Sequence, residues 1–294
     1  MQALEIIPEG AYGGSPYAAE PAKAGSGRRA FRGPHPRSFM ADPGGSLSGT
    51  IRAFSGNLCW GRADPQALID LIRRHEVDVF AAQELGPETA EAIAGELPFG
   101  ALEPSATHAF QGMGVALRRP GVFSQIPLPF RPARRVRLEP AEWPELGRSL
   151  DLINVHFQAP HSLRPFPSFW LRRRQVVALE QSLDAEPGLA RVVMGDFNAT
   201  PTWPLYRRLA RRFDDAVLEC AQRDQRAVQA TWGPRAEGAR YLRIDHVMVD
   251  GPRIERVETI RIPGSDHSGL LCEIRDEAAG AGAGAGAGVG VGVG

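Results

Sequence analysis

The sequence feature that most constrains this chain is the stretch RVVMGDFNAT, which begins at Arg191. Residues 192–194 form a short apolar run, Val-Val-Met, which predicts a buried strand. Because side chains alternate along a strand, continued extension would place Asp196 and Asn198 on one side and Phe197 on the other. The pattern predicts a carboxylate and a carboxamide side by side at a strand end, where catalytic groups are often mounted. A simple turn stays open as the alternative, because Gly-Asp-x-Asn is also good turn chemistry.

Length and composition limit the class of protein. The 294 residues suffice for one large domain or two small ones, and 43% hydrophobic residues allow a sizeable core. The formal net charge of +0 argues against a protein that binds nucleic acid by bulk electrostatics, although a local basic cleft stays open. Cys59, Cys220 and Cys272 lie far apart without a CxxC pair, so we expect reduced thiols. Without a long apolar run or a secretory signal, we expect a cytoplasmic protein with no membrane span.

Low-complexity segments flank the part of the chain that we expect to fold. Residues 1–48 are rich in Gly, Pro, Ala, Ser and Arg and show little periodicity, which predicts a disordered tail. An alternative for residues 25–37 is a small basic arm that binds nucleic acid. Residues 278–294 are dominated by a Gly-Ala and Gly-Val repeat and predict a second tail. The folded domain is therefore predicted at residues 49–277.

Within this domain, strand-like and helix-like segments follow one another in a mixed order. Asp64-Pro65 and Thr200-Pro201 both predict helix starts, with the first residue as the cap and proline at the first helical position. Further helices are predicted at 87–97 and 170–183. Strands are predicted at 50–55, 77–82, 114–117, 136–138, 150–157, 242–249, 254–262 and 269–274, besides the one before Asp196. Some of these strands alternate with helices and others follow directly, which favours layered sheets covered by helices.

Polar residues suited to metal or phosphate chemistry follow several of the predicted strands. They are Asn57, Glu84, His156, Asp196 with Asn198, and the pair Asp266-His267. Asp245 lies inside an apolar stretch, where a carboxylate is costly to bury unless it is paired. A single such residue is ordinary, since an isolated Glu after a strand is usually solvated and a lone His is usually structural. Their number favours one shared site.

These residues carry a resemblance to a known family. The motifs that carry it are Asn57, Gln83-Glu84, Asn154-Val155-His156, Gly195-Asp196-Phe197-Asn198, Ile244-Asp245-His246 and Gly264-Ser265-Asp266-His267. In this order they resemble the endonuclease/exonuclease/phosphatase superfamily, which includes deoxyribonuclease I. The resemblance covers about residues 50–275 and implies a four-layer α/β/β/α sandwich, in which helices flank two packed mixed sheets.

Finer details of the sequence resemble one bacterial subgroup of that superfamily. GDFNAT, Thr231-Trp232 and PGSDH are most similar to a subgroup that includes vancomycin-resistance-associated membrane proteins. Those members carry N-terminal membrane spans, and this sequence shows none. A role in the cell envelope is therefore not implied.

The resemblance implies a divalent metal ion, Mg²⁺ with Mn²⁺ as the alternative. Glu84 matches the main metal carboxylate of the family, with Asn57 and Asp266 nearby in the same pattern. Magnesium prefers oxygen ligands, so the residue types suit the ion. The metal would neutralise charge on a phosphoryl group.

The resemblance also implies roles for the other site residues. Asp196 matches the residue that positions or deprotonates the attacking water, and Asn198 and His156 match groups that hold phosphate oxygens. His267 matches a histidine that stabilises the pentacovalent phosphorus. Asp245 would orient that histidine, which would also explain a carboxylate in an apolar strand.

The function predicted from the sequence is a Mg²⁺-dependent hydrolase of phosphate esters, whether a phosphodiesterase, an endonuclease or a phosphatase. We expect a monomer. Nucleic acid stays open as the substrate although the net charge does not indicate it; a small phosphodiester, a lipid headgroup or a phosphomonoester fits as well. The alternative function is a catalytically silent binding module on the same fold, which would be expected to lack part of the metal or Asp–His set.

Four further segments have simpler interpretations. The arginine clusters at 131–137 and 207–212 are interpreted as solvated faces. Arg172 or Arg173, followed by Gln175, is interpreted as a structural part of a helix. Residues 159–170, rich in proline and aromatic residues, form either a substrate-facing loop or a packing segment.

Overall fold

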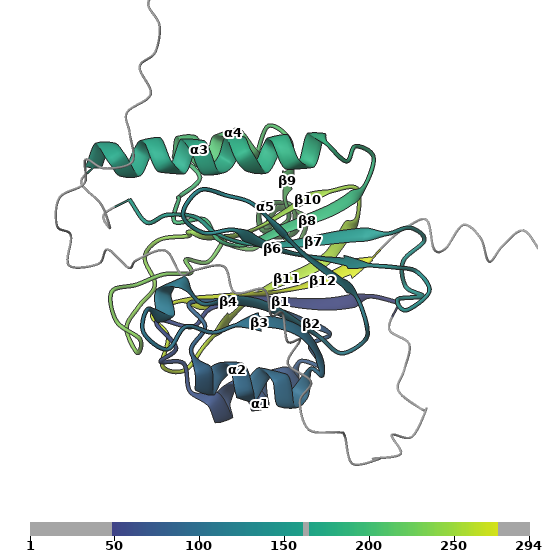
Figure 1. Ribbon diagram of the computed structural model, residues 1–294, viewed down its shortest axis with the longest axis horizontal. Coiled ribbons are helices and arrows are strands. Elements are labelled where there is room, and N and C mark those ends of the chain that lie inside the picture. Colours follow the sequence, from purple (N-terminus) through teal and green to yellow (C-terminus); the bar gives the residue numbers. More distant parts are fainter. Residues whose placement is uncertain (1–48, 161–164, 276–294) are drawn as a thin grey trace, which may run out of the picture. The chain divides into compact units, whose positions relative to one another are not determined.

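A computed structural model describes residues 49–160 and 165–275 of the chain. The predicted tails at 1–48 and 278–294 lie outside the described residues, and the domain limits at 49 and 277 stay a prediction. The described part contains two sheets of six strands each (Figure 1).

Each sheet is mixed, with one parallel pair of strands among antiparallel ones. The first sheet has the order β11 (Arg253–Arg261), β12 (Ser268–Arg275), β1 (Ile51–Asn57), β2 (Val79–Gln83), β4 (Met113–Leu117) and β3 (Phe99–Glu103). The second has the order β5 (Val122–Ile126), β6 (Ala133–Leu138), β7 (Leu150–His156), β8 (Ala190–Asp196), β10 (Asp245–Asp250) and β9 (Asp214–Asp215). The parallel pairs are β1 with β2 and β7 with β8.

The main hydrophobic core lies between the sheets. Along β8, Val192 and Met194 face this core, whereas Val193 belongs to a second core beneath helices. Both faces of the strand are therefore buried. This explains why its sequence is a continuous apolar run rather than an alternation of apolar and polar residues.

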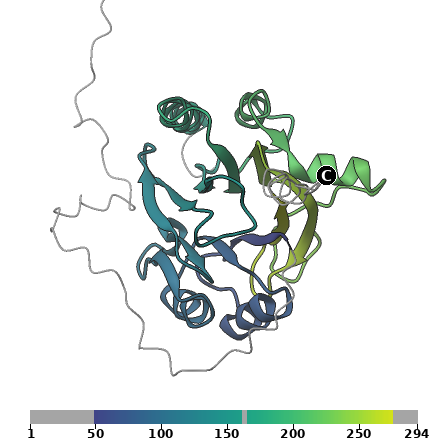
Figure 2. The ribbon, with the colours of Figure 1, turned by 90° about the vertical axis from the view of Figure 1, so that its right-hand side faces the viewer.

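Helices cover the outer faces of both sheets. The helices α1 (Pro65–Arg74) and α2 (Pro87–Glu96) pack on the first sheet, and α3 (Pro165–Asp184) and α4 (Pro204–Leu209) pack on the second. Figure 2 shows these pairs end-on, on opposite sides of the two sheets. A further helix, α5 (Ala216–Arg223), contributes to the main core, and η1 (Ala109–Gln111) is a single 3₁₀ turn. The predicted four-layer α/β/β/α sandwich is confirmed.

The prediction that a helix starts at Thr200-Pro201 is wrong. Trp203 N–H donates to the carbonyl of Thr200, which closes a turn, and α4 begins at Pro204. A helix from Pro201 could not continue through this second proline, because proline disfavours helical geometry in the residue before it. Trp203 is accordingly extended, with φ −83° and ψ 149°. The other predicted cap is confirmed, since Asp64 accepts hydrogen bonds from two N–H groups of α1.

Other differences concern edge elements and segment ends. The strands β3, β5 and β9 and the helix α5 were not predicted, and α3 starts before the predicted residue 170. The side chains of β3 and β5 are mostly exposed or half-buried, so their sequences lack the apolar period that indicates a strand. Their strand geometry follows from pairing with β4 and β6.

The structure also bears on the membrane and thiol predictions. Within the described ranges, no helix combines the length and apolar character needed to cross a membrane. All three cysteines are free thiols, as expected.

Candidate active site

The topology brings the predicted site residues to one edge of the sandwich. Because β1 and β2 are parallel, Asn57 ends one strand beside the end of the other, and Glu84 follows directly. In the second sheet, the parallel strands β7 and β8 also end side by side, which places His156 opposite Asp196. Four residues far apart in sequence thus meet where the carboxyl ends of parallel strands meet.

Two antiparallel strands complete the same edge from the other direction. The strand β10 begins with Asp245, which pairs with Asp196 in the register. The strand β12 runs antiparallel to β1, so the residue before it, His267, lies at the same end. Ser265 secures this turn, since its hydroxyl donates to the carbonyl of Asn57 at 2.7 Å and accepts from His267 N–H at 3.0 Å.

Asp196 lies at the centre of the site and is almost completely buried. Its Oδ2 accepts hydrogen bonds from Asn57 Nδ2 and from Asn198 Nδ2, both at 3.0 Å, and its Oδ1 accepts from Asn198 N–H at 2.7 Å. Burial raises the pKa of Asp196 to about 7; the neighbouring Asp245 carboxylate adds to the rise and His267 opposes it. A carboxylate with this pKa can accept a proton near neutral pH.

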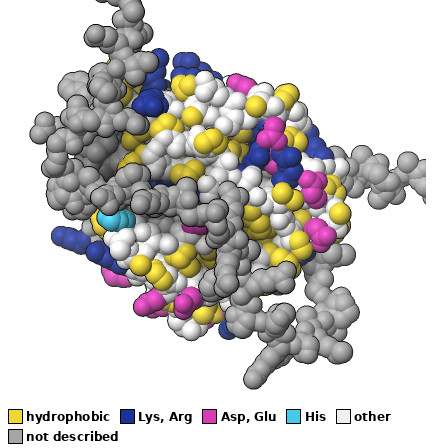
Figure 3. All heavy atoms as spheres, in the orientation of Figure 1, with side chains coloured by type: hydrophobic (Ala, Val, Ile, Leu, Met, Phe, Trp, Pro, Cys, Tyr) yellow, Lys and Arg dark blue, Asp and Glu magenta, His cyan; other side chains and the backbone are white. Residues whose placement is uncertain are grey.

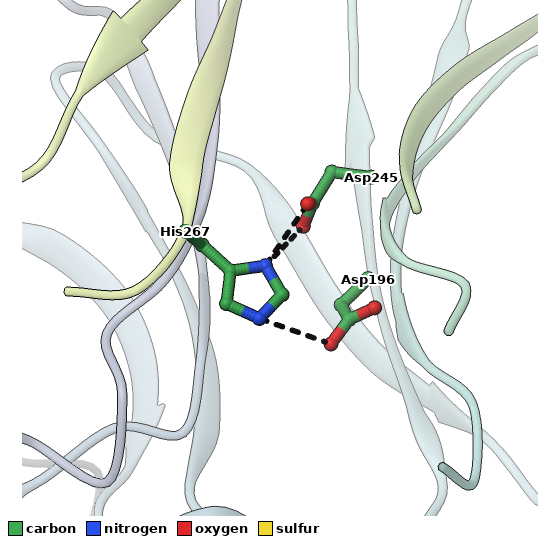
Figure 4. Close-up of side chains that lie close together, drawn as sticks. All are labelled: Asp196, Asp245 and His267. Carbon is green, nitrogen blue, oxygen red and sulfur yellow. Dashed lines mark hydrogen bonds and ion pairs between the residues drawn. The ribbon is translucent and has the colours of Figure 1, made fainter. Parts of the chain in front are cut away.

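His267 is paired with Asp245 and faces Asp196 (Figure 4). Its Nδ1 lies 2.9 Å and 3.2 Å from the two Asp245 oxygens, and its Nε2 lies 3.9 Å from Asp196 Oδ2. Burial alone would lower the pKa of His267, but Asp245, Asp196 and Asp266 together raise it to about 10. The ring is therefore a buried cation that can donate from both nitrogens. The predicted pairing of His267 with Asp245 is present.

His156 differs from His267 in charge although the two histidines border the same carboxylate. Its Nε2 lies 3.5 Å from Asp196 Oδ2 and 3.8 Å from Glu84 Oε1. Burial, with smaller contributions from Arg131 and His267, holds the pKa of His156 well below its usual range. The ring is therefore neutral, and it can offer one N–H donor to a ligand.

Glu84 and Asn57 form the part of the site that best suits a metal ion. Glu84 Oε1 accepts from Asn57 Nδ2 at 3.2 Å, and Glu84 Oε2 accepts from Trp60 N–H at 2.8 Å. Burial raises the pKa of the Glu84 carboxyl, although the hydrogen bond from Asn57 and the charge of His267 oppose this. Asn57 Nδ2 faces this carboxylate, while Asn57 Oδ1 accepts from Cys59 N–H at 2.9 Å, so the largely buried Glu84 oxygens are the ligand atoms that best suit a hard divalent cation. Asp266 lies at the rim, half-buried, and its Oδ2 accepts from Trp232 Nε1 at 3.0 Å.

A second set of potential ligand atoms comes from Asp196, Asp245 and His267, which lie within 4.8 Å of one another. This set suits a metal less well than the first. Metal binding requires a neutral imidazole, whereas His267 is held protonated and its Nδ1 is already bonded to Asp245.

Behind the site, a polar contact locks the two sheets together. Asn154 Nδ2 donates to the carbonyls of Ala82 and Gly114, both at 2.9 Å, and its Oδ1 accepts from Gln83 Nε2 at 2.7 Å. Gln83 precedes Glu84 and Asn154 lies two residues before His156. These two motif residues therefore hold the strands that carry site residues.

The sequence interpretation missed two buried arginines, one of which, Arg131, contacts the site. The reading of 131–137 as a solvated face is wrong for Arg131 and Arg134, which are buried. Arg131 Nη1 donates to the carbonyl of His156 at 3.1 Å. Burial lowers the pKa of Arg131 to about 10, although Glu84 and Asp196 oppose this. No pattern in the sequence separates this arginine from exposed ones, because its burial depends on a contact with a distant strand.

The helix α3 supports the loops that border the site. Arg172 is buried and donates to the carbonyl of Gln158. Burial lowers the pKa of its guanidinium, and the negative charge of Asp196 opposes this shift. Gln175 accepts from Gln158 N–H at 3.0 Å and donates to the carbonyl of Pro129 at 3.0 Å. These contacts agree with the structural role expected for the Arg–Gln pair. The 207–212 cluster is mostly exposed, as predicted.

Comparison with known proteins identifies the family. The family model described as "Endonuclease/Exonuclease/phosphatase family" matches residues 54–267. No curated protein matches the chain.

Solved structures show the same fold. A humanized TDP2 of D. rerio has a TM-score of 0.61 and 17% identity, covering 78% of this chain and 100% of that one. The human Nocturnin catalytic domain with bound sulfate has a TM-score of 0.57 and 19% identity, covering 78% and 95%. A mannosyl-6-phosphatase of Bacteroides thetaiotaomicron has a TM-score of 0.59 and 14% identity, covering 76% and 99%. Together with the family match over more than half of its length, these findings show that the chain belongs to the endonuclease/exonuclease/phosphatase family.

Proposed function

We propose that this protein is a divalent-metal-dependent hydrolase of phosphate esters that acts by in-line attack of water. The observation that carries the proposal is the environment of Asp196. This buried carboxylate accepts hydrogen bonds from two carboxamides. It lies between the neutral imidazole of His156 and the protonated imidazole of His267. Family membership supports the same reaction class.

In the proposed mechanism, Asp196 holds the attacking water and takes its proton. The carboxylate is fixed by Asn57 and by Asn198, so that its orientation does not depend on the substrate. Its raised pKa suits proton transfer near neutral pH. The water must then lie beside Asp196 Oδ2, on the side that His267 and His156 also face.

Positive charge and N–H donors would stabilise the phosphoryl group. His267 presents Nε2–H toward this position while Asp245 holds Nδ1. His156 supplies a further donor to phosphate oxygens. The role proposed for Asn198 requires its Nδ2 to exchange the carbonyl of Phe157 for a phosphate oxygen. A Mg²⁺ ion held by Glu84 and Asn57, with Asp266 at the rim, would neutralise phosphoryl charge when bound. Mn²⁺ fits the same oxygen ligands.

Two proteins of the same fold agree with this reaction class. The Nocturnin domain holds a sulfate, a tetrahedral anion of the same geometry as phosphate. The Bacteroides protein is a mannosyl-6-phosphatase. Neither decides which ester this chain hydrolyses.

The test is hydrolysis of a substrate panel by purified protein, with Mg²⁺ and with EDTA. The panel includes bis-p-nitrophenyl phosphate, p-nitrophenyl phosphate, oligonucleotides and sphingomyelin. Asp196→Ala and His267→Ala should each lower kcat by at least about 100-fold, the usual contribution of a positioned proton-transfer group. Asp184→Ala removes an exposed carboxylate of α3 as the matched control. Metal-independent turnover, or near-normal turnover by either variant, would contradict the mechanism, and Mg²⁺ binding without turnover would favour the silent binding module.

A further inference from the structure

We propose that the substrate is a single-stranded nucleic acid, held by exposed aromatic side chains on both sides of the reacting phosphate and by two arginines in a groove along α3. This inference rests on the proposed function, because it names the ester that the site would hydrolyse. It is carried by three features outside the catalytic residues.

The first feature is an aromatic cluster beside Glu84. Trp60 donates its N–H to Glu84 Oε2, and its side chain is 54% exposed. Its ring lies 5.4 Å from that of Phe110, which in turn packs against the His108 ring at 5.8 Å. Trp60 also has a left-handed φ of 60°. A bulky residue in this conformation costs on the order of 1–3 kcal/mol and is typical of functional sites.

The second feature is Phe130, on the His156 side of the site. Its side chain is 53% exposed, and its φ of 71° is also left-handed. The next residue, Arg131, is anchored by its bond to the carbonyl of His156. The strained backbone therefore directs a large apolar side chain to solvent next to a residue that is fixed to the site. A ligand that covers Phe130 would explain both its exposure and its conformation.

The third feature is a groove of about 350 Å³ along α3. Pro129, Trp170, Arg173 and Arg174 are among the residues that line it. It lies near the site, because Pro129 precedes Phe130 and at most about 7 Å of chain separates it from Arg131, which is bonded to the carbonyl of His156. The bond from Gln175 to the carbonyl of Pro129 holds the helix and this loop together.

The charge of the groove selects an anionic ligand. No carboxylate of the described residues lies within ion-pair distance of Arg173 or Arg174. By contrast, Arg208 and Arg212 are each paired with a carboxylate of α3. Figure 3 shows arginine side chains gathered at the upper margin, where Figure 1 places α3 and α4. The guanidinium of Arg173 lies 5.9 Å from the ring of Trp170, so cationic and aromatic groups share one surface.

Alternating aromatic and cationic groups fit a strand whose bases are free to stack. Stacking of a base on an aromatic side chain contributes about 1–3 kcal/mol, and guanidinium groups follow the phosphates. A duplex keeps its bases stacked and hidden, so it could not use these rings. The net charge of +0 does not oppose this proposal, because the cations needed are local.

The arginines are tested by binding of a labelled single-stranded oligonucleotide to the Asp196→Ala protein in EDTA, by fluorescence anisotropy. Two single-strand phosphate contacts account for about 1.4 of the slope of log K against log salt. Arg173→Ala/Arg174→Ala should therefore weaken binding about tenfold or more and lower the slope by about that amount. Arg207→Ala/Arg211→Ala removes the same charge from exposed positions on and after α4 and should change neither.

The aromatic side chains are tested with a second ligand, a strand of abasic sites that keeps the phosphates and lacks the bases. Trp60→Leu and Phe130→Leu should each weaken binding of the normal strand about tenfold and leave the abasic strand unaffected. Phe99→Leu, at an exposed position at the far end of β3, is the matched control. Circular dichroism of each variant checks its fold.

The outcomes separate this inference from the proposed function. Tight binding that depends on both residue sets, with Mg²⁺-dependent cleavage of the strand by the unmodified protein, supports both. Hydrolysis of another ester with no variant-sensitive strand binding overturns the inference and leaves the proposed function intact. Preferential binding and hydrolysis of sphingomyelin vesicles, dependent on the same aromatics, overturns it in favour of a membrane substrate. Strand binding without hydrolysis of any ester rejects the proposed function and hence this strand as its substrate.

Discussion

Replacement of Asn154 by leucine tests whether the polar lock between the sheets stabilises the fold. The Asn154 side chain is completely buried and makes three hydrogen bonds to the first sheet. Leucine has nearly the same size and shape but can neither donate nor accept. The substitution therefore removes the bonds while leaving little new space.

The expected magnitude follows from the partners left behind. The carbonyls of Ala82 and Gly114 lose the Asn154 donor, and each buried group that loses its partner costs about 1–3 kcal/mol. Gln83 Nε2 loses least, because it also donates to Ser55 Oγ and to the carbonyl of Ala81. The free energy of unfolding should therefore fall by roughly 2–6 kcal/mol, a large part of the roughly 5–15 kcal/mol of a typical domain.

Urea unfolding followed by circular dichroism measures this loss. With an m-value near 3 kcal/mol/M, a loss of about 4 kcal/mol lowers the midpoint by roughly 1–2 M. Gln125→Leu, which removes an exposed amide from β5, should change stability by less than about 0.5 kcal/mol. A loss below about 1 kcal/mol for Asn154→Leu would refute the reasoning, since water or a shifted strand would then satisfy the carbonyls.

Three further predictions concern other parts of the fold and the site. Gly195→Ala should destabilise the protein and lower activity, because at φ 139° its Cβ would lie 2.0 Å from the carbonyl oxygen of Val155 in the adjacent strand; thermal unfolding and turnover measure both effects. Asp215→Ala should cost about 3–5 kcal/mol in urea unfolding, because it leaves Arg243 buried without its carboxylate. Burial alone would raise the pKa of Asp215, but His246, Arg243 and Tyr206 together lower it, so its stabilisation should be complete above about pH 4 and decline as the pH falls further. A flat unfolding free energy between about pH 4 and pH 2, with no difference from Asp215→Asn, would contradict this. Glu84→Ala should raise the Mg²⁺ concentration needed for activity and weaken Mn²⁺ binding measured by electron paramagnetic resonance; unchanged Mn²⁺ affinity would place the metal elsewhere.

Much of the site could be predicted because its residues follow from local patterns. Apolar runs mark the central strands, and the polar residue at each strand end is visible in the sequence. Asparagine occurs only at positions 57, 154 and 198, and all three side chains make hydrogen bonds at or behind the site. Asp245 could be singled out because a carboxylate inside an apolar strand requires a partner.

The features of the fold and the site that could not be predicted depend on contacts between segments far apart in the sequence. The edge strands β3 and β5 have few buried side chains, so pairing rather than periodicity determines them. Arg131 and Arg172 look like any exposed arginine until the carbonyls of His156 and Gln158 are placed beside them. Sequence spacing carries no information on those carbonyls. The helix start predicted at Thr200-Pro201 is wrong for a local reason: Pro204 disfavours helical geometry at Trp203, so α4 begins only at Pro204.

The candidate site is divided between the two sheets, and this division links its chemistry to folding. The first sheet supplies Asn57, Glu84 and His267, and the second supplies His156, Asp196 and Asp245. The decisive bonds cross the interface, from Asn57 to Asp196 and from His267 to Asp245. If either sheet stood alone, these side chains would face water. Closure of the sandwich buries them, and the hydrogen bonds across the interface then avoid the cost of buried polar groups without partners. The Asp196 and His267 environments can therefore form only when the sandwich closes. Asn154→Leu, which weakens the contact between the sheets, should consequently lose activity at lower urea concentrations, in step with its lower unfolding midpoint.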